Sequence, residues 1–121
     1  APYLLYVFAR INSIFKKSTL SNIAQEFSNI KEFETNYEKL LTRKLIQFPF
    51  ALEQCLSDLR PHFLCTYLFE LSGIFNTYYS NDKIIHENKE TQIRRLTLCH
   101  RTRLILKIGL ELLGIDTVEK M

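Results

Sequence analysis

The residues best suited to binding chemistry are cations concentrated near the end of the 121-residue chain. Between Gln92 and Leu113 there are five basic side chains and one acid, about +4 in charge, whereas the whole chain carries a formal charge of +3. Such a concentration favours a polyanionic partner over general solubility. On a helical wheel the exposed candidates form two groups, one on each side of an apolar face: His100, Arg103 and Lys107 on one side, and Arg94 and Arg101 on the other.

No pattern in the chain indicates catalysis. The three histidines and three cysteines stand in no metal-ligand spacing. No nucleophile has a base at a recognisable spacing, and there is no glycine-rich phosphate loop. We therefore expect no catalytic residue, cofactor or metal here. An odd number of cysteines without a C-x-x-C pair favours reduced thiols and a cytoplasmic protein, and no apolar run approaches the ~20 residues of a membrane span.

The elements that must position these cations are helices. Apolar residues recur at the helical period through most of the chain, which predicts an all-α bundle of about five or six helices in a single domain, residues 1–121. Residues 18–34 are the least readable, and a short helix near Leu20–Phe27 and a surface connection both stay open. We expect helices at Tyr3–Lys17, from near Asn36 to about Gln47, from Pro49, from Pro61 to a break at Asn81–Lys83, and from Glu90 to Gly114.

Several residues mark where helices begin and end. Thr35-x-x-Glu38 has the form of a capping box, and Pro49 and Pro61 suit first helical turns. Gly114 can close the last helix in the left-handed conformation, with Ile115 folding back on the helix. The apolar positions of the helix from Pro49 and of the last helix predict these inward-facing residues: Leu52, Cys55, Leu56, Leu59, Leu98, Cys99, Thr102, Ile105, Leu106, Leu112 and Leu113.

Three further residues fall at informative wheel positions. Tyr78 lies near the centre of an apolar stripe, so we expect a core ring whose hydroxyl reaches an edge. Tyr79 lies about 100° further round, where it is either a singly exposed aromatic or a ring that stacks on a nucleobase. Arg95 falls among apolar residues, which predicts a buried ion pair, with Glu70 and Asp82 as candidate partners.

Distinctive motifs stand at both ends and in the middle of the chain. They are Tyr6-x-x-Ala9-Arg10-Ile11-x-Ser13-Ile14-Phe15-Lys16-Lys17, Pro61-His62-x-Leu64-x-x-Tyr67-Leu68-x-x-Leu71 continuing to Phe75-Asn76-x-x-Tyr79, Arg95-Leu96-x-Leu98, Gly109-Leu110-x-Leu112-Leu113-Gly114-Ile115 and Val118-Glu119-Lys120-Met121. In this order they resemble the C-terminal, DALR-type anticodon-binding domain of arginyl-tRNA synthetases. The ending is the most specific, and the family usually has Arg-Lys at the position of Lys16-Lys17.

The resemblance implies binding of the anticodon loop of an arginine-accepting tRNA by a fragment that is inactive alone. ATP and magnesium would be used elsewhere in a longer, monomeric enzyme with no membrane contact. Tyr79 and Met121 are implied at the loop, and the expected phosphate contacts are Arg10, Lys17, Arg94, His100, Arg101, Arg103 and Lys107. Two alternatives stay open: a helical protein-interaction or oligomerisation module without RNA binding, and the equivalent domain of a cysteinyl- or glycyl-tRNA synthetase.

Overall fold

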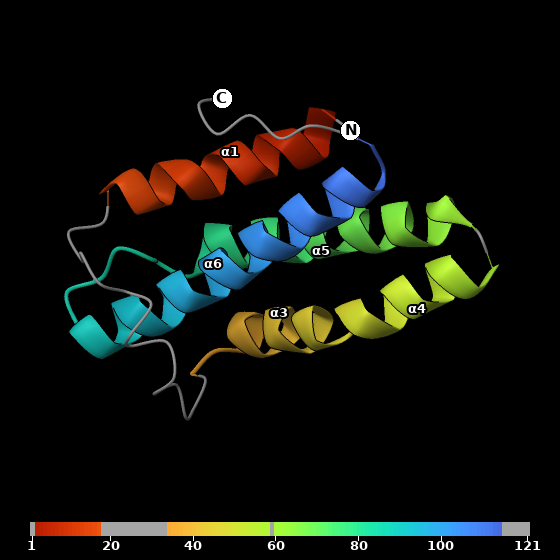
Figure 1. Ribbon diagram of the computed structural model, residues 1–121. Helices are drawn as coiled ribbons and strands as arrows, with labels where there is room; N and C mark the ends of the chain where they lie inside the picture. The colour runs from red at the N-terminus through yellow and green to blue at the C-terminus, as the bar shows by residue number, and fades with distance from the viewer. Residues whose placement is uncertain (1, 18–33, 59, 115–121) are drawn as a thin grey trace.

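The computed structural model describes residues 2–17, 34–58 and 60–114, and the described residues form helices joined by short connections, without strands. The expected all-α bundle is confirmed, whereas the segment Leu20–Phe27 lies outside the described residues. Figure 1 shows the five described helices: α1 (Pro2–Lys17), α3 (Asn36–Ile46), α4 (Phe48–Asp58), α5 (Pro61–Asn81) and α6 (Lys89–Leu112).

The centre of the bundle is the pair α5 and α6. Helix α1 packs against both on one side, and α3 packs against both on the opposite side, with α4 continuing from α3 along α5 (Figure 1). Each central helix therefore has neighbours on two sides, and their apolar side chains are the most deeply buried. Examples are Leu68, Phe75, Leu96 and Leu106, all without solvent exposure. Burying a side chain of this size contributes ~1.5–3 kcal/mol.

The helix ends follow the predicted local signals. The Thr35 hydroxyl accepts from the Glu38 backbone N–H at 3.1 Å, and the Glu38 carboxylate accepts from the Thr35 N–H at 3.1 Å, which confirms the capping box. Pro61 lies in the first turn of α5. Asn88 caps α6 by accepting from the Thr91 N–H at 3.1 Å. Gly114 has φ +80°, the left-handed conformation expected of it, while Ile115 lies outside the described residues.

A second glycine lies where the two central helices are in contact. A Cβ built on Gly109 of α6 would lie 2.7 Å from a terminal methyl carbon of Leu68 on α5. Real Cβ atoms do not approach so closely, so any larger residue at position 109 must displace Leu68 or separate the helices. The present position of the Leu68 side chain against α6 therefore depends on the absence of a side chain at Gly109.

Two apolar residues that we expected inside the core lie on the surface. Leu56 is 63% exposed and Leu112 is 55% exposed, so both predictions are wrong. Helix α4 packs on α5 and α3, and its opposite side has no described neighbour; none of its described side chains is fully buried. The end of α6 is likewise covered on fewer sides than its middle. A wheel gives the direction of a side chain, but it does not tell whether a neighbouring helix reaches that position.

Candidate nucleic-acid interface

A groove of about 840 Å³ runs between α1 and the end of α5, and we name it the α1–α5 groove. Helix α1 contributes Tyr6, Arg10 and Lys17, α5 contributes Tyr79, and the connection after α5 contributes Lys83. A volume of this order is typical of sites that hold small molecules or single chemical groups of a larger partner. Its walls combine aromatic rings with cations.

Arg10 lies between two tyrosine rings in this groove. Its guanidinium carbon is 4.5 Å from the centroid of Tyr79 and 4.9 Å from that of Tyr6. Its Nη1 donates to the side-chain oxygen of Asn76 at 3.1 Å, and its Nη2 donates to the Tyr6 hydroxyl at 2.7 Å. Tyr79 also stacks on Phe75, with ring centroids 6.3 Å apart. We name Tyr6, Arg10 and Tyr79 the aromatic–arginine platform. Its side chains are held in place before any ligand arrives.

The two adjacent tyrosines behave as their wheel positions predict. Tyr79 is 38% exposed, whereas Tyr78 is fully buried and donates its hydroxyl to the Arg95 carbonyl at 3.2 Å. Burial raises the pKa of Tyr78 well above its ordinary value, so the hydroxyl stays a neutral donor. We did not predict from the sequence that Tyr6 contacts Arg10. The spacing could have indicated this contact, because Tyr6 and Arg10 stand four residues apart on one helix and residues so spaced are neighbours.

A second groove, of about 590 Å³, lies between α1 and α6, and we name it the α1–α6 groove. It gathers the predicted stripe of His100, Arg103 and Lys107 with Phe15 and Lys16 of α1. The stripe is therefore confirmed as one cluster. Lys17, by contrast, lies in the first groove, and Arg101 is exposed on α6.

Arg103 in the α1–α6 groove contacts three neighbouring side chains. Its guanidinium carbon lies 4.3 Å from the Phe15 ring centroid, and its Nη1 donates to the Asn12 side-chain oxygen at 2.9 Å. Its Nη2 lies 3.2 Å from Nδ1 of His100. Arginine can only donate, so that Nδ1 accepts and the ring is neutral with its proton on Nε2. Burial, then the charges of Arg103 and Arg101, lower the pKa of His100, in agreement with a neutral ring.

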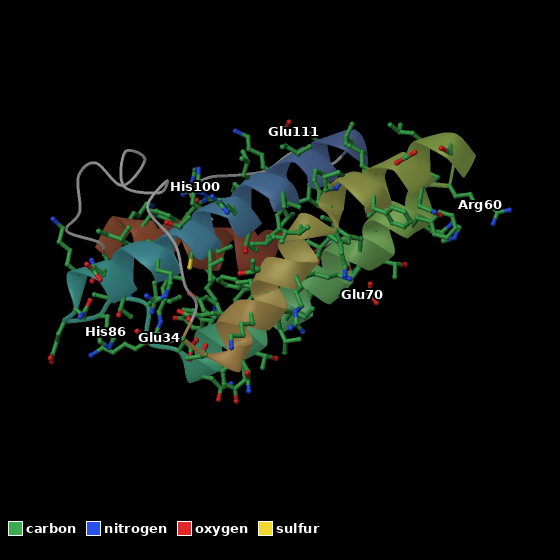
Figure 2. All side chains as sticks on the ribbon, turned by 90° about the horizontal axis from the view of Figure 1, so that it is seen from below. Glu34, Arg60, Glu70, His86, His100 and Glu111 are labelled. Carbon is green, nitrogen blue, oxygen red and sulfur yellow. The ribbon has the colours of Figure 1, made fainter. Side chains whose placement is uncertain are left out.

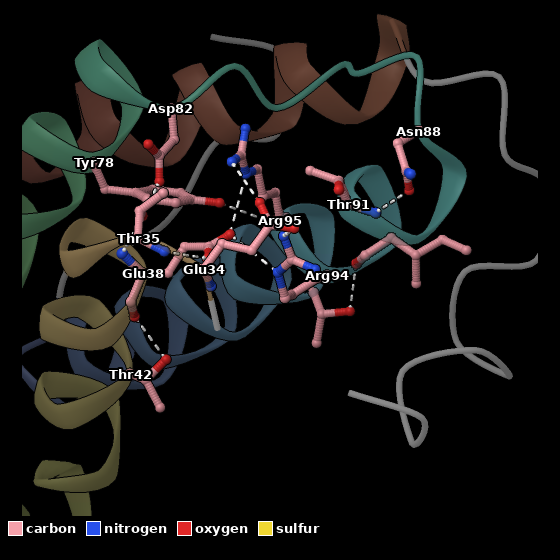
Figure 3. Close-up of polar contacts among 12 residues, drawn as sticks. Glu34, Thr35, Glu38, Thr42, Tyr78, Asp82, Asn88, Thr91, Arg94 and Arg95 are labelled. Carbon is pink, nitrogen blue, oxygen red and sulfur yellow. Dashed lines mark hydrogen bonds and ion pairs between the residues drawn. The ribbon is translucent and has the colours of Figure 1, made fainter. Parts of the chain in front are cut away.

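Arg94 lies in neither groove, and our expectation that it faces solvent is wrong. Its side chain is only 11% exposed, and its Nε donates to Glu38 Oε2 at 3.1 Å (Figure 3). Glu38 is fully buried. The Nη2 of Arg94 also lies 3.3 Å from a carboxylate oxygen of Glu34. The pairing was missed because Glu38 already had a local role in the capping box, and the partner is 56 residues away along the chain.

Arg95 shares the same carboxylate. Its Nε donates to Glu38 Oε2 at 3.1 Å, so the predicted buried ion pair is confirmed. Both candidate partners are wrong. Glu70 instead pairs with Lys44 at 2.9 Å on the surface, where Figure 2 shows its side chain pointing outward, and Asp82 accepts from the Thr35 hydroxyl at 2.5 Å.

Glu38 remains ionised in this buried setting. Burial alone would raise the pKa of its carboxyl, but the backbone N–H groups of Thr35 and Glu34 and the two arginines together lower it below its ordinary value. We name Glu38, Arg94 and Arg95 the buried ion cluster. Arg95 also donates from Nη1 to the Lys83 carbonyl at 2.7 Å, and this contact fixes one wall of the α1–α5 groove.

This helical bundle is similar to known proteins in sequence and in fold. Residues 4–121 match the DALR anticodon binding domain family. The chain belongs to this family. It is 41% identical over 121 residues to an arginine–tRNA ligase of Mannheimia succiniciproducens and 43% identical over 121 residues to one of Prochlorococcus marinus. All of this chain is covered in both comparisons, but only 21% and 20% of those relatives, so the chain spans about a fifth of their length.

Solved structures agree with this family assignment. The arginyl-tRNA synthetase of Plasmodium falciparum superposes with a TM-score of 0.82 at 32% identity, over 98% of this chain and 21% of that one. The arginyl-tRNA synthetase of Thermus thermophilus superposes with a TM-score of 0.81 at 27% identity, over 99% of this chain and 21% of that one. The family resemblance predicted from the motifs is thus confirmed.

Met121 lies outside the described residues. Among the described residues, no three His, Cys, Asp or Glu side chains converge as metal ligands. No described helix is both long enough and apolar enough to cross a membrane.

Proposed function

We propose that this chain binds the anticodon loop of an arginine-accepting tRNA, as the C-terminal domain of an enzyme that ligates arginine to that tRNA with ATP. The observation that carries the proposal is the aromatic–arginine platform, which stands open at the edge of a groove of about 840 Å³. The family assignment and the arginine–tRNA ligases among the relatives support it. They also favour arginine over the cysteine- or glycine-specific enzymes.

The platform suits an unstacked nucleobase. Single-stranded loops are read by stacking their bases on aromatic rings or guanidinium planes and by hydrogen bonds to base edges. The exposed part of the Tyr79 ring offers the stacking surface. Within the described residues the Arg10 guanidinium donates two hydrogen bonds, and its other N–H groups are available to a base carbonyl or a phosphate. Lys17 and Lys83 line the same groove and would contact the backbone, which fixes register without reading sequence.

Catalysis belongs, in this proposal, to the remainder of the enzyme. Arginine, ATP and magnesium would be bound there, in the part of the relatives' length that this chain does not span. Binding at the anticodon loop would help to place the acceptor end for charging. We further propose that the protein is a cytoplasmic monomer. The three free cysteines support a reducing compartment.

A direct test compares two RNA hairpins. Fluorescence anisotropy would measure the dissociation constant of the chain for an arginine anticodon stem-loop and for a hairpin changed only in its anticodon. We expect tighter binding of the arginine hairpin. Equal and negligible binding of both would contradict the proposal.

The protein-interaction alternative has one observation in its favour. Leu104, Ile108 and Leu112 form an exposed apolar stripe along α6. Sedimentation over a range of concentrations separates the two readings, because an oligomerisation module gains mass with concentration and a monomeric RNA-binding domain does not.

A further inference from the structure

Asn76 of α5 connects Arg10 to a residue outside the α1–α5 groove. Its side-chain oxygen accepts from Arg10 Nη1 at 3.1 Å, and its side-chain nitrogen donates to the Tyr3 hydroxyl at 2.7 Å. Asn76 is half-buried and is not among the residues that line the groove. It therefore contacts the aromatic–arginine platform from outside the groove, so its effect on a ligand would pass through Arg10.

The orientation of this amide is decided by its partners. Arginine only donates hydrogen bonds, so the oxygen of Asn76 is the atom that faces Arg10, and the nitrogen then faces Tyr3. Tyr3 is itself held in place, because its ring stacks on Phe69 of α5 with centroids 5.8 Å apart and planes inclined by 8°. A continuous series of contacts thus runs from Phe69 through Tyr3 and Asn76 to Arg10.

Asn76 relates Arg10 to the opposite wall of the groove. The other hydrogen bond of Arg10 goes to the Tyr6 hydroxyl, which belongs to the same helix and to a side chain that is 53% exposed. Asn76 instead belongs to α5, three residues before Tyr79, and residues at this spacing are neighbours on a helix. The Tyr79 ring attracts the guanidinium at 4.5 Å, but such attraction does not fix where individual N–H groups point. A hydrogen bond is directional, so the bond to Asn76 does fix it.

The direction of the guanidinium matters for base recognition. Stacking on an aromatic ring tolerates every base, whereas hydrogen bonds to a base edge discriminate between bases. The N–H groups of Arg10 that are not bonded to Asn76 or Tyr6 are the donors that could make such bonds. A guanidinium that rotated would still attract RNA, but it would distinguish one base from another less well.

We propose that Asn76 is a positioning residue for the anticodon site. Its amide holds Arg10 so that the remaining N–H groups meet acceptor atoms on the edge of a base stacked beside Tyr79. The inference rests on the proposed function and extends it. Asn76 thereby contributes to the choice between anticodons more than to general RNA affinity.

The test measures selectivity, defined as the dissociation constant for the anticodon-altered hairpin divided by that for the arginine hairpin. Asn76→Ala removes the amide, and Tyr3→Phe removes only the hydroxyl that accepts from it, with the ring left on Phe69. Asn81→Ala is the matched control, because Asn81 is an exposed asparagine of the same helix whose amide donates to the Thr77 carbonyl at 2.7 Å. Thermal unfolding of each variant verifies the fold.

We expect Asn76→Ala to lower the selectivity about tenfold, the scale of one hydrogen bond to a charged group. Affinity for the altered hairpin and the midpoint of thermal unfolding should change little. Tyr3→Phe should lower selectivity by less, because the amide keeps its bond to Arg10, and Asn81→Ala should match the original chain. In the background of Arg10→Ala, which removes the oriented donor itself, Asn76→Ala should cause no further loss of selectivity.

An unchanged selectivity in folded Asn76→Ala, with Tyr79→Ala still weakening binding, would overturn the positioning role alone. Equal weakening of both hairpins would do the same, as would a further loss of selectivity in the Arg10→Ala background. If Asn76→Ala does not fold, Tyr3→Phe decides, and an unchanged selectivity there overturns the role. Absence of binding by the original chain would overturn the proposed function and the positioning role with it.

Discussion

Two arginine clusters in this bundle differ in what surrounds the guanidinium groups. In the buried ion cluster, Arg94 and Arg95 both donate to the fully buried carboxylate of Glu38. In the aromatic–arginine platform, Arg10 lies between two tyrosine rings and bonds to a neutral amide and a hydroxyl. The first cluster has its charge balanced internally. In the second cluster the described hydrogen-bond partners of Arg10 are neutral, so its positive charge is kept at the edge of a groove.

The difference shows that an arginine's partners decide its role more than its place in a basic helix does. A carboxylate partner neutralises the arginine's charge and so lowers the cost of burying it. Removing one partner of such a pair leaves the other charge buried and uncompensated. An aromatic partner contributes ~0.5–1 kcal/mol at an exposed site and leaves the charge available. Arg94 and Arg101 belong to the same helix, yet one is enclosed by carboxylates and the other is exposed.

The largest effect is expected from removing the shared carboxylate. Glu38→Ala leaves Arg94 and Arg95 without their buried partner and removes half of the capping box, so the free energy of unfolding should fall by ~3–5 kcal/mol. Urea unfolding followed by circular dichroism measures it. Glu70→Ala is the matched control, because Glu70 is an exposed partner of Lys44, and such a pair contributes ~0–1 kcal/mol. Equal losses in the two variants would contradict the distinction between buried and exposed pairs.

The same carboxylate should make stability depend on pH. The pKa of Glu38 is lower in the folded chain than its ordinary value, so its contribution is complete above the ordinary value and is lost as the pH falls through the folded one. Glu38→Gln has no such titration. We therefore expect the stability difference between the original chain and Glu38→Gln to narrow in acid, as measured by urea midpoints from neutral to acidic pH. A difference that stays constant would mean that the carboxyl titrates alike in both states.

Substitutions in the aromatic–arginine platform should change RNA affinity and leave the free energy of unfolding nearly unchanged. Tyr79→Ala removes the exposed ring beside Arg10, and binding of the arginine hairpin should weaken by ~1–3 kcal/mol, the range for one stacked base. Tyr79→Phe keeps the ring and its stacking on Phe75, so it should retain most of the affinity. Anisotropy titrations of both variants provide the measurement. If the folded alanine variant binds as tightly as the original chain, Tyr79 lies outside the RNA site.

Local signals in the sequence predicted the helix ends and the burial of several side chains. They did not predict which residues of different helices form ion pairs. The capping box, the two prolines and Gly114 act within one turn, so they placed the helix ends nearly where they lie. The wheel separated Tyr78 from Tyr79 and placed Arg95 inside. It could not tell that α3 brings Glu38 to Arg94, because that contact depends on how the helices pack. The prediction that Leu56 is buried was wrong for the same reason, since nothing local reveals that α4 has no described neighbour on its outer side.

The smallest effect is expected from a substitution of Tyr78, the residue next to Tyr79. This substitution tests most directly whether the buried and the exposed tyrosine have different roles. Tyr78→Phe removes only the hydroxyl that donates to the Arg95 carbonyl, so the free energy of unfolding should fall by ~0.5–1.5 kcal/mol while RNA affinity stays constant. Adjacent tyrosines would then give opposite outcomes, one altering stability and the other altering binding. Urea unfolding and hairpin titration on the same preparations decide it. A Tyr78→Phe chain that keeps its stability but loses RNA affinity would mean that the buried ring, through Arg95 and Lys83, shapes the groove.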